Sequence, residues 1–586
     1  MRRMKGAAGL LTALLLAFQL SAQTFALANE DNGIKVVPVN FTHNGYSYEI
    51  EGVAKSTDGD YQIKSPARLA ARKLPSTYDP RSSGEITTVK DQASTGACWA
   101  FSALACAEQD LIKKGLENPS AEFSVPALVL SSNSGTATGK DDFSSGGNWL
   151  FAASALANGQ GLCYEDYEPF LESGTENMIV SENKKSVSEY RLNYVMELSS
   201  TTQVKRKIME LGAVSASYFA GNGYMNHNNT AYYDPDASKN TIINHSVTVV
   251  GWDDNYSKDN FRYKPANNGA WLVKGSWGAD QDNDGFYWVS YDEAEFGQFC
   301  CYDFEESCDN TYHYSKMTGY VVNASNDGSV YGANVFTAKA DEKLDKAGFM
   351  YVGKTGSADY TLSVYTNVSD SNPIGVLETQ ISGSVSANGF YTVDFPEDIL
   401  LEEGEKYSIS VKFSGDSGRG YLLAESDRTS KVQSGQSYVS LNGKYWSDVG
   451  ADKTDSIGSL FIYAYTDDTA KPDKSSLETT LAKYGTLAGC EREANNARTV
   501  LADENASKND ISNAQKLLIS AAEEQDEALV ITTEAQWESF AKRVSSGESF
   551  EGKLVTLEGD LDFDGKTISP VGDSVNPFMG YFDGNG

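Results

Sequence analysis

The sequence feature that most constrains the fold is the stretch from Gln92 to Ser102, which reads Gln-Ala-Ser-Thr-Gly-Ala-Cys-Trp-Ala-Phe-Ser. Its cysteine, Cys98, opens a run whose apolar residues recur at helical spacing: Phe101, Leu104, Ala105, Leu111 and Ile112. The run predicts an amphipathic helix with Cys98 at or beside its N-terminus. The unpaired N–H groups and the dipole at a helix N-terminus favour a thiolate there.

Two interpretations of Cys98 follow from the residues alone. A free cysteine is most often a small, buried core residue. A thiolate beside a cationic imidazole is instead a nucleophile, and the side-chain amide of Gln92 is close enough in sequence to bind the oxyanion that its attack creates. Together, Gln92 and the residues that follow Cys98 favour the nucleophile.

His245 is the candidate base. It begins a predicted strand in Asn244-His245-Ser246-Val247, far downstream of Cys98. A single histidine is more often structural than catalytic. This chain also contains a candidate nucleophile at a helix N-terminus, and His245 lies at the start of a strand. The separation of the two residues is similar to that in a general signature of cysteine peptidases, which favours the interpretation of His245 as the base.

Composition excludes some partners. The chain carries 81 acidic and 48 basic residues, a formal charge of −33, which argues against nucleic acid and anionic lipid surfaces. Its 40% hydrophobic and 11% aromatic content is ordinary for globular proteins. A chain of 586 residues is too long to fold around a single hydrophobic core, so we expect several domains.

The first residues predict export. Basic residues precede an apolar run over residues 7–20, and Ala26-Leu27-Ala28 forms a small-x-small cleavage site. This pattern is typical of a secretory signal peptide. No later stretch is apolar over the ~20 residues that a membrane helix needs. We therefore expect a secreted or surface-associated protein without a membrane span.

We expect no cofactor, no metal and no disulfide scaffold. Seven cysteines are few for a chain of this length, although the cluster of Cys300, Cys301 and Cys308 has room for one bridge. The four histidines lack metal-ligand spacing to that cluster. Two Asp-x-Asp-x-Asp-Gly stretches, at 280–285 and 560–565, start like calcium loops but lack the glutamate at the twelfth position, which favours turns.

Patterns along the chain divide it into six segments. Helical periodicity precedes strand patterns in the first globular part, alternating strands follow, and a break at Pro472 introduces two predicted helices. A closing turn signal predicts that the last module continues beyond Gly586. The predicted segments are a signal peptide (1–28), an N-terminal or pro-like segment (29–73), an α+β domain (74–301), a β-sandwich (302–466), a helical spacer (467–529) and the start of a β-repeat module (530–586).

Three stretches resemble the papain family of cysteine peptidases, within residues 74–300. The segment around Cys98 is similar to the active-site segment of that family, Asn244–Trp252 to its histidine segment, and Trp271–Gly278 to its asparagine segment. The resemblance implies a papain-like fold in which Cys98 is the nucleophile, His245 the base and Gln92 an oxyanion donor.

The resemblance also implies a substrate site. Gly146-Gly147 is similar to the glycine pair that binds a substrate peptide as an added strand. Trp277 is assigned to the same site and would also shield His245. Glu108 stands where the family also keeps a glutamate, which accounts for an acid on the apolar stripe of the helix.

This chain departs from the family at several positions. Gly275 stands where the family has the asparagine that orients the histidine, and glycine has no side chain to accept the imidazole N–H. Thr95, Ser131 and Ser144 stand where the family has disulfide cysteines, and Thr95 and Ser144 would be the two partners of one bridge. We expect a slower or retuned enzyme.

The remaining segments also resemble known modules. The β-sandwich is similar to the lectin-like domain attached to some bacterial papain-like peptidases. The last stretch is similar to the opening of repeat modules in bacterial surface β-helix proteins. The overall expectation is an α+β papain-like catalytic domain, an all-β sandwich, a small helical spacer and the start of a β-helix-like module, in an exported or wall-associated bacterial protein.

Two functions from different classes follow. The favoured one is a secreted endopeptidase that acts on protein or peptide substrates, with a β-sandwich that holds it on a glycan or cell-wall component. The alternative is a surface adhesin whose peptidase domain has lost catalysis, with Gly275 as the trace of that loss.

Overall fold

The computed structural model describes two strands within residues 35–54 and, apart from short internal gaps, residues 74–132, 143–170, 189–315, 320–531 and 534–584. The predicted signal peptide lies outside the described residues. The described chain divides into two compact units, one that ends at Lys471 and one that begins at Pro472. None of the described helices is long and apolar enough to cross a membrane.

The helix that the sequence predicts at Cys98 is present in the first unit. The helix α2 (Cys98–Lys114) starts at the candidate nucleophile and ends at Gly115, whose positive φ of 73° suits a glycine. The Asn148 side chain caps α4 (Trp149–Ala157) by accepting the N–H groups of Leu150 and Phe151. Together with α3 (Val125–Ser132), these helices form one side of the core, and α2 packs on the strands β8 (His245–Asp253) and β11 (Gly297–Glu306).

A long sheet forms the other side of this core. The strand predicted at His245 is present, and two further strands include Trp271 and Tyr287. In the sheet, β8 pairs with β5 in a register that sets Tyr218 opposite His245. The strands and the helix of this part are β4 (Tyr190–Leu198), α6 (Thr201–Leu211), β5 (Val214–Tyr218), β8, β9 (Ala270–Lys274), β10 (Phe286–Ser290) and β11.

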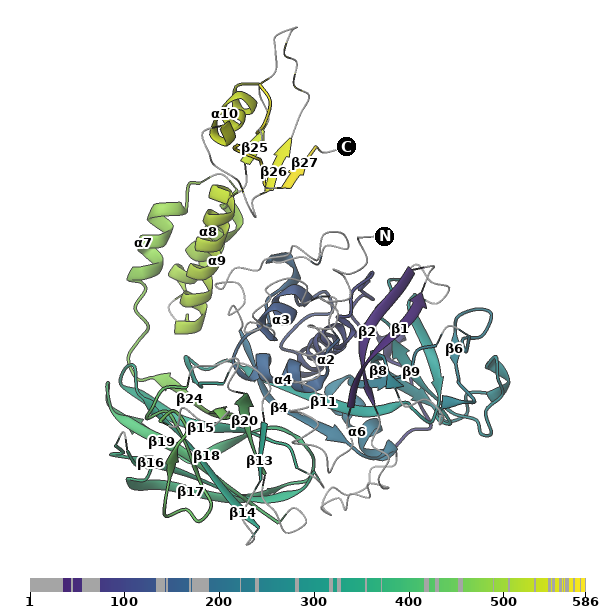
Figure 1. The fold of residues 1–586 in the computed structure, drawn as a ribbon, viewed down its shortest axis with the longest axis horizontal. Helices are drawn as coiled ribbons and strands as arrows, with labels where there is room; N and C mark the ends of the chain where they lie inside the picture. Colours follow the sequence, from purple (N-terminus) through teal and green to yellow (C-terminus); the bar gives the residue numbers. More distant parts are fainter. Residues whose placement is uncertain are drawn as a thin grey trace, which may run out of the picture. The chain divides into compact units, whose positions relative to one another are not determined.

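The sheet does not end at the domain boundary. Its strand order, β12-β24-β15-β18-β4-β11-β5-β8-β9-β10-β6, runs from the predicted β-sandwich into the α+β part and ends at the short strand β6 (Ala231–Tyr232). The junction is the pairing of β18 (Gly389–Leu401) with β4, where Gly389 is opposite Met196 and Phe390 opposite Val195 (Figure 1). The boundary expected between residues 301 and 302 lies inside β11.

The region from 310 to 468 is a β-sandwich. A six-stranded sheet, in the order β17-β16-β19-β14-β21-β22, packs on the first strands of the long sheet around an apolar core that includes Tyr407, Ile409, Val411 and Phe413. Its strands are β12 (Asn310–Tyr312), β14 (Ser329–Thr337), β15 (Glu342–Tyr351), β16 (Ala358–Thr366), β17 (Val376–Val385), β18, β19 (Lys406–Ser414), β21 (Ser437–Ser440), β22 (Ser447–Asp448) and β24 (Ile462–Asp468). Two small strand groups complete the first unit: β13 (Tyr320–Asn323) with β20 (Tyr421–Ser426) and β23 (Ile457–Leu460), and β1 (Lys35–His43) with β2 (Tyr46–Ala54) and β7 (Ile242–Ile243).

Among the described residues, the second unit has two more helices than the sequence predicts. Between α7 (Ser475–Tyr484) and α9 (Lys508–Glu527) lies α8 (Glu491–Ala502). Its buried face consists mainly of Ala494 and Ala497, which give little hydrophobic periodicity. Beyond it, α10 (Glu534–Ser545) accompanies a parallel sheet of β25 (Leu529–Ile531), β26 (Leu554–Leu557) and β27 (Tyr581–Asp583).

Candidate active site

The start of α2 meets the start of β8. The Cys98 Sγ accepts a hydrogen bond from the backbone N of Ser246 at 3.4 Å, which places the residue after His245 directly on the thiol. One turn further along α2, the Ser102 hydroxyl donates to the carbonyl of Val247 at 2.8 Å. Burial raises the pKa of the Cys98 thiol, while hydrogen bonds from the N–H groups of Ser246 and Trp99 act in the opposite direction. A thiolate at Cys98 therefore needs a proton acceptor.

Aromatic rings hold the imidazole of His245. The Trp277 ring stacks on it, with centroids 4.3 Å apart and planes at 6°, and Tyr218 meets it edge to face at 5.9 Å. The preceding residue, Asn244, is tied by its side chain to the backbone of Ala220, with the Ala220 N–H donating to Oδ1 at 2.7 Å. Both the ring plane and the backbone of the histidine are therefore fixed. The structure places Trp277 against the candidate base.

Gln92 is fixed by the segment that contains Gly275. Its Oε1 accepts the Ser276 hydroxyl at 2.6 Å, and its backbone N–H donates to the Ser276 carbonyl at 2.7 Å. Its Nε2 donates to the carbonyl of Thr95 at 2.8 Å. Because an amide nitrogen carries two hydrogens, this contact engages one of them. The Thr95 hydroxyl closes the loop by donating to the carbonyl of Gln92 at 2.7 Å.

Tyrosine rings border the position of Gly275. A Cβ there would lie 3.1 Å from the carbonyl oxygen of Gly285 and 3.5 Å from Cε1 of Tyr287. The Tyr287 hydroxyl shares a hydrogen bond of 2.9 Å with the hydroxyl of Tyr218, the ring that contacts His245. Tyr287 thus borders the position where Gly275 lacks a side chain, and its hydrogen-bonded partner Tyr218 contacts the candidate base, His245. Sequence reasoning missed both tyrosines because each reads as an ordinary strand residue.

The Gly146-Gly147 segment packs against Trp99, the residue that follows the candidate nucleophile Cys98. A Cβ at Gly147 would come within 2.5 Å of the indole ring of Trp99, so only glycine fits this close approach. Trp99 follows Cys98 in α2. The structure therefore brings Gly147 against the residue that follows Cys98, where the sequence resemblance expects a substrate strand to be added.

A buried polar cluster anchors α2 to the same sheet. Glu108 is 2% exposed, and its carboxylate accepts the Thr87 hydroxyl at 2.7 Å and the Phe123 N–H at 3.1 Å. The ammonium of Lys274, the residue before Gly275, lies 3.8 Å from this carboxylate. Burial lowers the pKa of Lys274, and the charge of Glu108 opposes this effect. Sequence reasoning found Glu108 but missed Lys274, although Lys274 lies within the Trp271–Gly278 segment.

The cysteines and the candidate metal residues form no further site in the part of the chain that the structure describes. All seven cysteines are unbridged, including the cluster that had room for one bridge. Cys300 and Cys301 alternate along β11, so they enter different cores. No group of three metal-ligating side chains occurs among the described residues. Most of both aspartate-rich stretches, and Ser144, lie outside them.

Comparison with known proteins identifies two domains. Residues 74–324 match the papain family cysteine proteases, and residues 311–466 match the lectin-like domains. Among curated proteins, the chain is similar to cathepsin K of Mus musculus (24% identity, 36% of this chain and 59% of that protein) and to cathepsin L2 of Homo sapiens (26%, 38% and 62%). The chain thus spans about three fifths of the length of these relatives.

Two solved structures cover more of the chain. The clostridial cysteine protease Cwp84 after propeptide cleavage shares 28% identity at a TM-score of 0.58, over 67% of this chain and 99% of that one. The cysteine protease and lectin-like domains of Cwp84, a surface layer associated protein of Clostridium difficile, share 27% identity at a TM-score of 0.58, over 70% of this chain and 91% of that one. The chain therefore contains a papain-family cysteine peptidase domain joined to a lectin-like domain.

Proposed function

We propose that this protein is a secreted or surface-associated cysteine endopeptidase that hydrolyses peptide bonds with a Cys98–His245 pair. The observation that carries the proposal is the contact between the Cys98 Sγ and the Ser246 N–H, which brings the histidine strand onto the nucleophile. The likeness to Cwp84, which is described as surface layer associated, supports the location.

The proposed reaction begins with proton transfer from the Cys98 thiol to the His245 imidazole. The thiolate attacks the scissile carbonyl, and the imidazolium then protonates the leaving amine. Water attacks the resulting thioester and releases the second product. The second N–H of the Gln92 amide and the backbone N–H of Cys98 stabilise the oxyanion at both stages.

Gly275 is compatible with this reaction because the contacts of Trp277 and Tyr218 with His245 can orient the imidazole in place of an asparagine side chain. A stacked indole restricts the rotation of the imidazole, and its π face stabilises an imidazolium. The lectin-like domain would add binding to a glycan or cell-wall component. Loss of the orienting asparagine supports the alternative, a surface adhesin without catalysis.

The first test is the rate of Cys98 alkylation as a function of pH, followed by peptide mass spectrometry. Because burial raises the pKa of the isolated thiol, Cys98 alone would react only at alkaline pH. An ion pair with His245 predicts fast reaction at pH ~5–6 that is lost in His245→Ala. Reaction only at alkaline pH in the wild type would contradict the pair and favour the adhesin.

The second test is cleavage of oxidised insulin B chain. We expect the wild-type protein to cut this peptide and Cys98→Ala to leave it intact. Equal cleavage by both proteins would exclude Cys98 as the nucleophile.

A further inference from the structure

We propose that the lectin-like domain helps to position the substrate-binding segment of the peptidase domain. Its residue Asn388 sets the position of the Gly146-Gly147 segment through Glu197 and Trp149. This inference rests on the proposed peptidase function and deepens it. The three residues are positioning residues, because none of them touches Cys98 or His245 in the described contacts.

Glu197, on β4, joins the two domains at one point. Its Oε1 accepts the indole N–H of Trp149 at 3.1 Å, and its Oε2 accepts the Nδ2 of Asn388 at 3.1 Å. The Glu197 backbone N–H also donates to the Asn388 carbonyl at 2.9 Å. The carboxylate thus bridges the first residue of α4 and the residue before β18. Burial raises the pKa of Glu197, and both side-chain donors oppose this effect.

The lectin-like side of this bridge is rigid. The Asn388 Oδ1 accepts the N–H of Gly353 at 2.9 Å, so both ends of the side-chain amide are engaged. At the next residue, a Cβ on Gly389 would lie 2.1 Å from the carbonyl oxygen of Val195. Only glycine permits the approach that pairs β18 with β4 here. Asn388 is therefore held in place by its own domain and by the shared sheet.

The peptidase side of the bridge leads directly to the glycine pair. Trp149 lies two residues after Gly147, with only the N-cap Asn148 between them. Gly147 in turn is in contact with the ring of Trp99, beside Cys98. A shift of the Glu197 carboxylate would move the indole that it binds, and the short connection would pass that movement to Gly147. The backbone that would pair with substrate therefore depends on a residue of the lectin-like domain.

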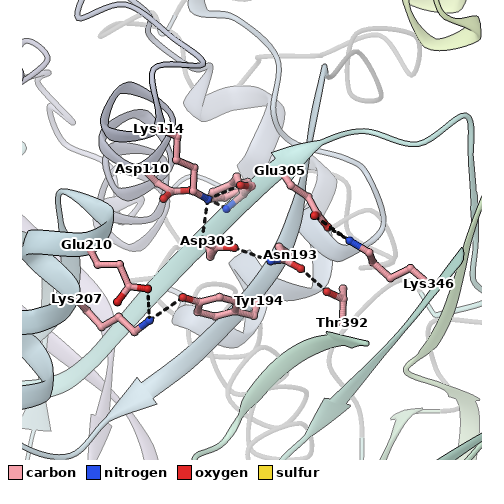
Figure 2. Close-up of polar contacts among 11 residues, drawn as sticks. Asp110, Lys114, Asn193, Tyr194, Lys207, Glu210, Asp303, Glu305, Lys346 and Thr392 are labelled. Atoms are coloured by element: carbon pink, nitrogen blue, oxygen red, sulfur yellow. Dashed lines mark hydrogen bonds and ion pairs between the residues drawn. The ribbon is translucent and has the colours of Figure 1, made fainter. Parts of the chain in front are cut away.

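Other contacts at the same boundary provide a comparison. Figure 2 shows Thr392 of β18 bonded to Asn193 of β4, and Lys346 of β15 bonded to Glu305 of β11. The first of these contacts continues through Asp303 to Lys114, at the end of α2 that is opposite Cys98. Such contacts join the domains without reaching the glycine pair. Lys346→Ala is therefore a matched control for Asn388→Ala.

The experiment uses the full chain and oxidised insulin B chain. We expect Asn388→Ala to raise KM by about tenfold with kcat nearly unchanged, because backbone pairing contributes equally to ground-state and transition-state binding. Trp149→Phe, which keeps the ring and removes the N–H, should act in the same direction. Lys346→Ala should leave KM within about twofold of the wild-type value. The alkylation rate of Cys98 should be unchanged in all three variants.

A binding measurement separates this inference from the peptidase proposal. In the Cys98→Ala background, adding Asn388→Ala should raise the Kd for intact insulin B chain by the same factor as KM, measured by calorimetry. If the wild type cuts nothing but this Kd still rises, the peptidase proposal fails and the inference holds. An unchanged KM and Kd, an equal rise in Lys346→Ala, or no binding at all would each overturn the inference.

Discussion

The histidine of this site is held by rings rather than by the amide that its family uses. The Trp277 stack at 4.3 Å and the Tyr218 contact at 5.9 Å together restrict the imidazole plane. Tyr287 fixes Tyr218 through its hydroxyl and also borders Gly275. Where Gly275 lacks a side chain, aromatic rings therefore pack around the candidate base, as our proposal of a retuned peptidase requires.

Trp277→Ala tests the role of the stack. Without the indole, the imidazole loses both its restraint and the π face that stabilises its cation, so kcat/KM should fall by about 10- to 100-fold. Trp277→Phe keeps an aromatic face and should retain most of the activity. The measurement is kcat/KM for insulin B chain, together with the pH profile of Cys98 alkylation. A loss in Trp277→Phe as large as in Trp277→Ala would indicate that the stack is not what orients the base.

At the scale of elements, α2 is anchored far from the end that carries the candidate nucleophile, Cys98. Asp110, on α2, accepts the N–H of Phe304 on β11 at 2.7 Å and the ammonium of Lys114 at 2.8 Å, and Lys114 also contacts Asp303 (Figure 2). Burial raises the pKa of Asp110 to about 7, with Lys114 and the Phe304 N–H opposing and Asp303 adding to the shift. This contact holds α2 against the sheet that carries His245.

The raised pKa of Asp110 makes the anchoring of α2 dependent on pH. The folded state binds the proton more tightly than the unfolded chain, whose carboxyl has its ordinary pKa of 3.8. Protonation of Asp110 therefore adds at most about 4 kcal/mol to the free energy of unfolding. This contribution is fully present below pH ~4 and is lost as the pH rises to about 7. We expect the Tm of wild type minus that of Asp110→Asn to fall over this range and to level off above it. A difference that is constant with pH would contradict the shift.

Pairing between β4 and β18 requires a glycine at position 389. A Cβ on Gly389 would lie 2.1 Å from the Val195 carbonyl oxygen, so Gly389→Ala should lower the free energy of unfolding by about 2–4 kcal/mol. Gly297→Ala, where a Cβ meets nothing within 4 Å, is the control and should cost less than about 1 kcal/mol. Urea unfolding gives the free energies, and hydrogen exchange of β4 and β18 locates the change. Equal stability of the two variants would contradict the close pairing.

At the scale of the whole molecule, local patterns predicted some features and long-range pairing decided others. The helix that begins at Cys98 and the strand that begins at His245 follow from periodicity and residue type near each position. The bridge between Glu197 and Asn388 joins residues 191 positions apart, and nothing in either neighbourhood indicates the other. The same reason explains why the boundary expected after residue 301 falls inside β11. A strand pattern shows that a strand exists but does not show its neighbour.

The shared sheet has a consequence for the independence of the two domains. A peptidase fragment cut at the expected boundary would lose β18 and expose the edge of β4 at Val195 and Met196, the two residues that β18 pairs with. Open edges of this kind recruit strands from other molecules and promote aggregation. The lectin-like domain thus covers part of an open edge of its neighbour, and exchange of such domains between proteins would require the exchange of matching edge strands.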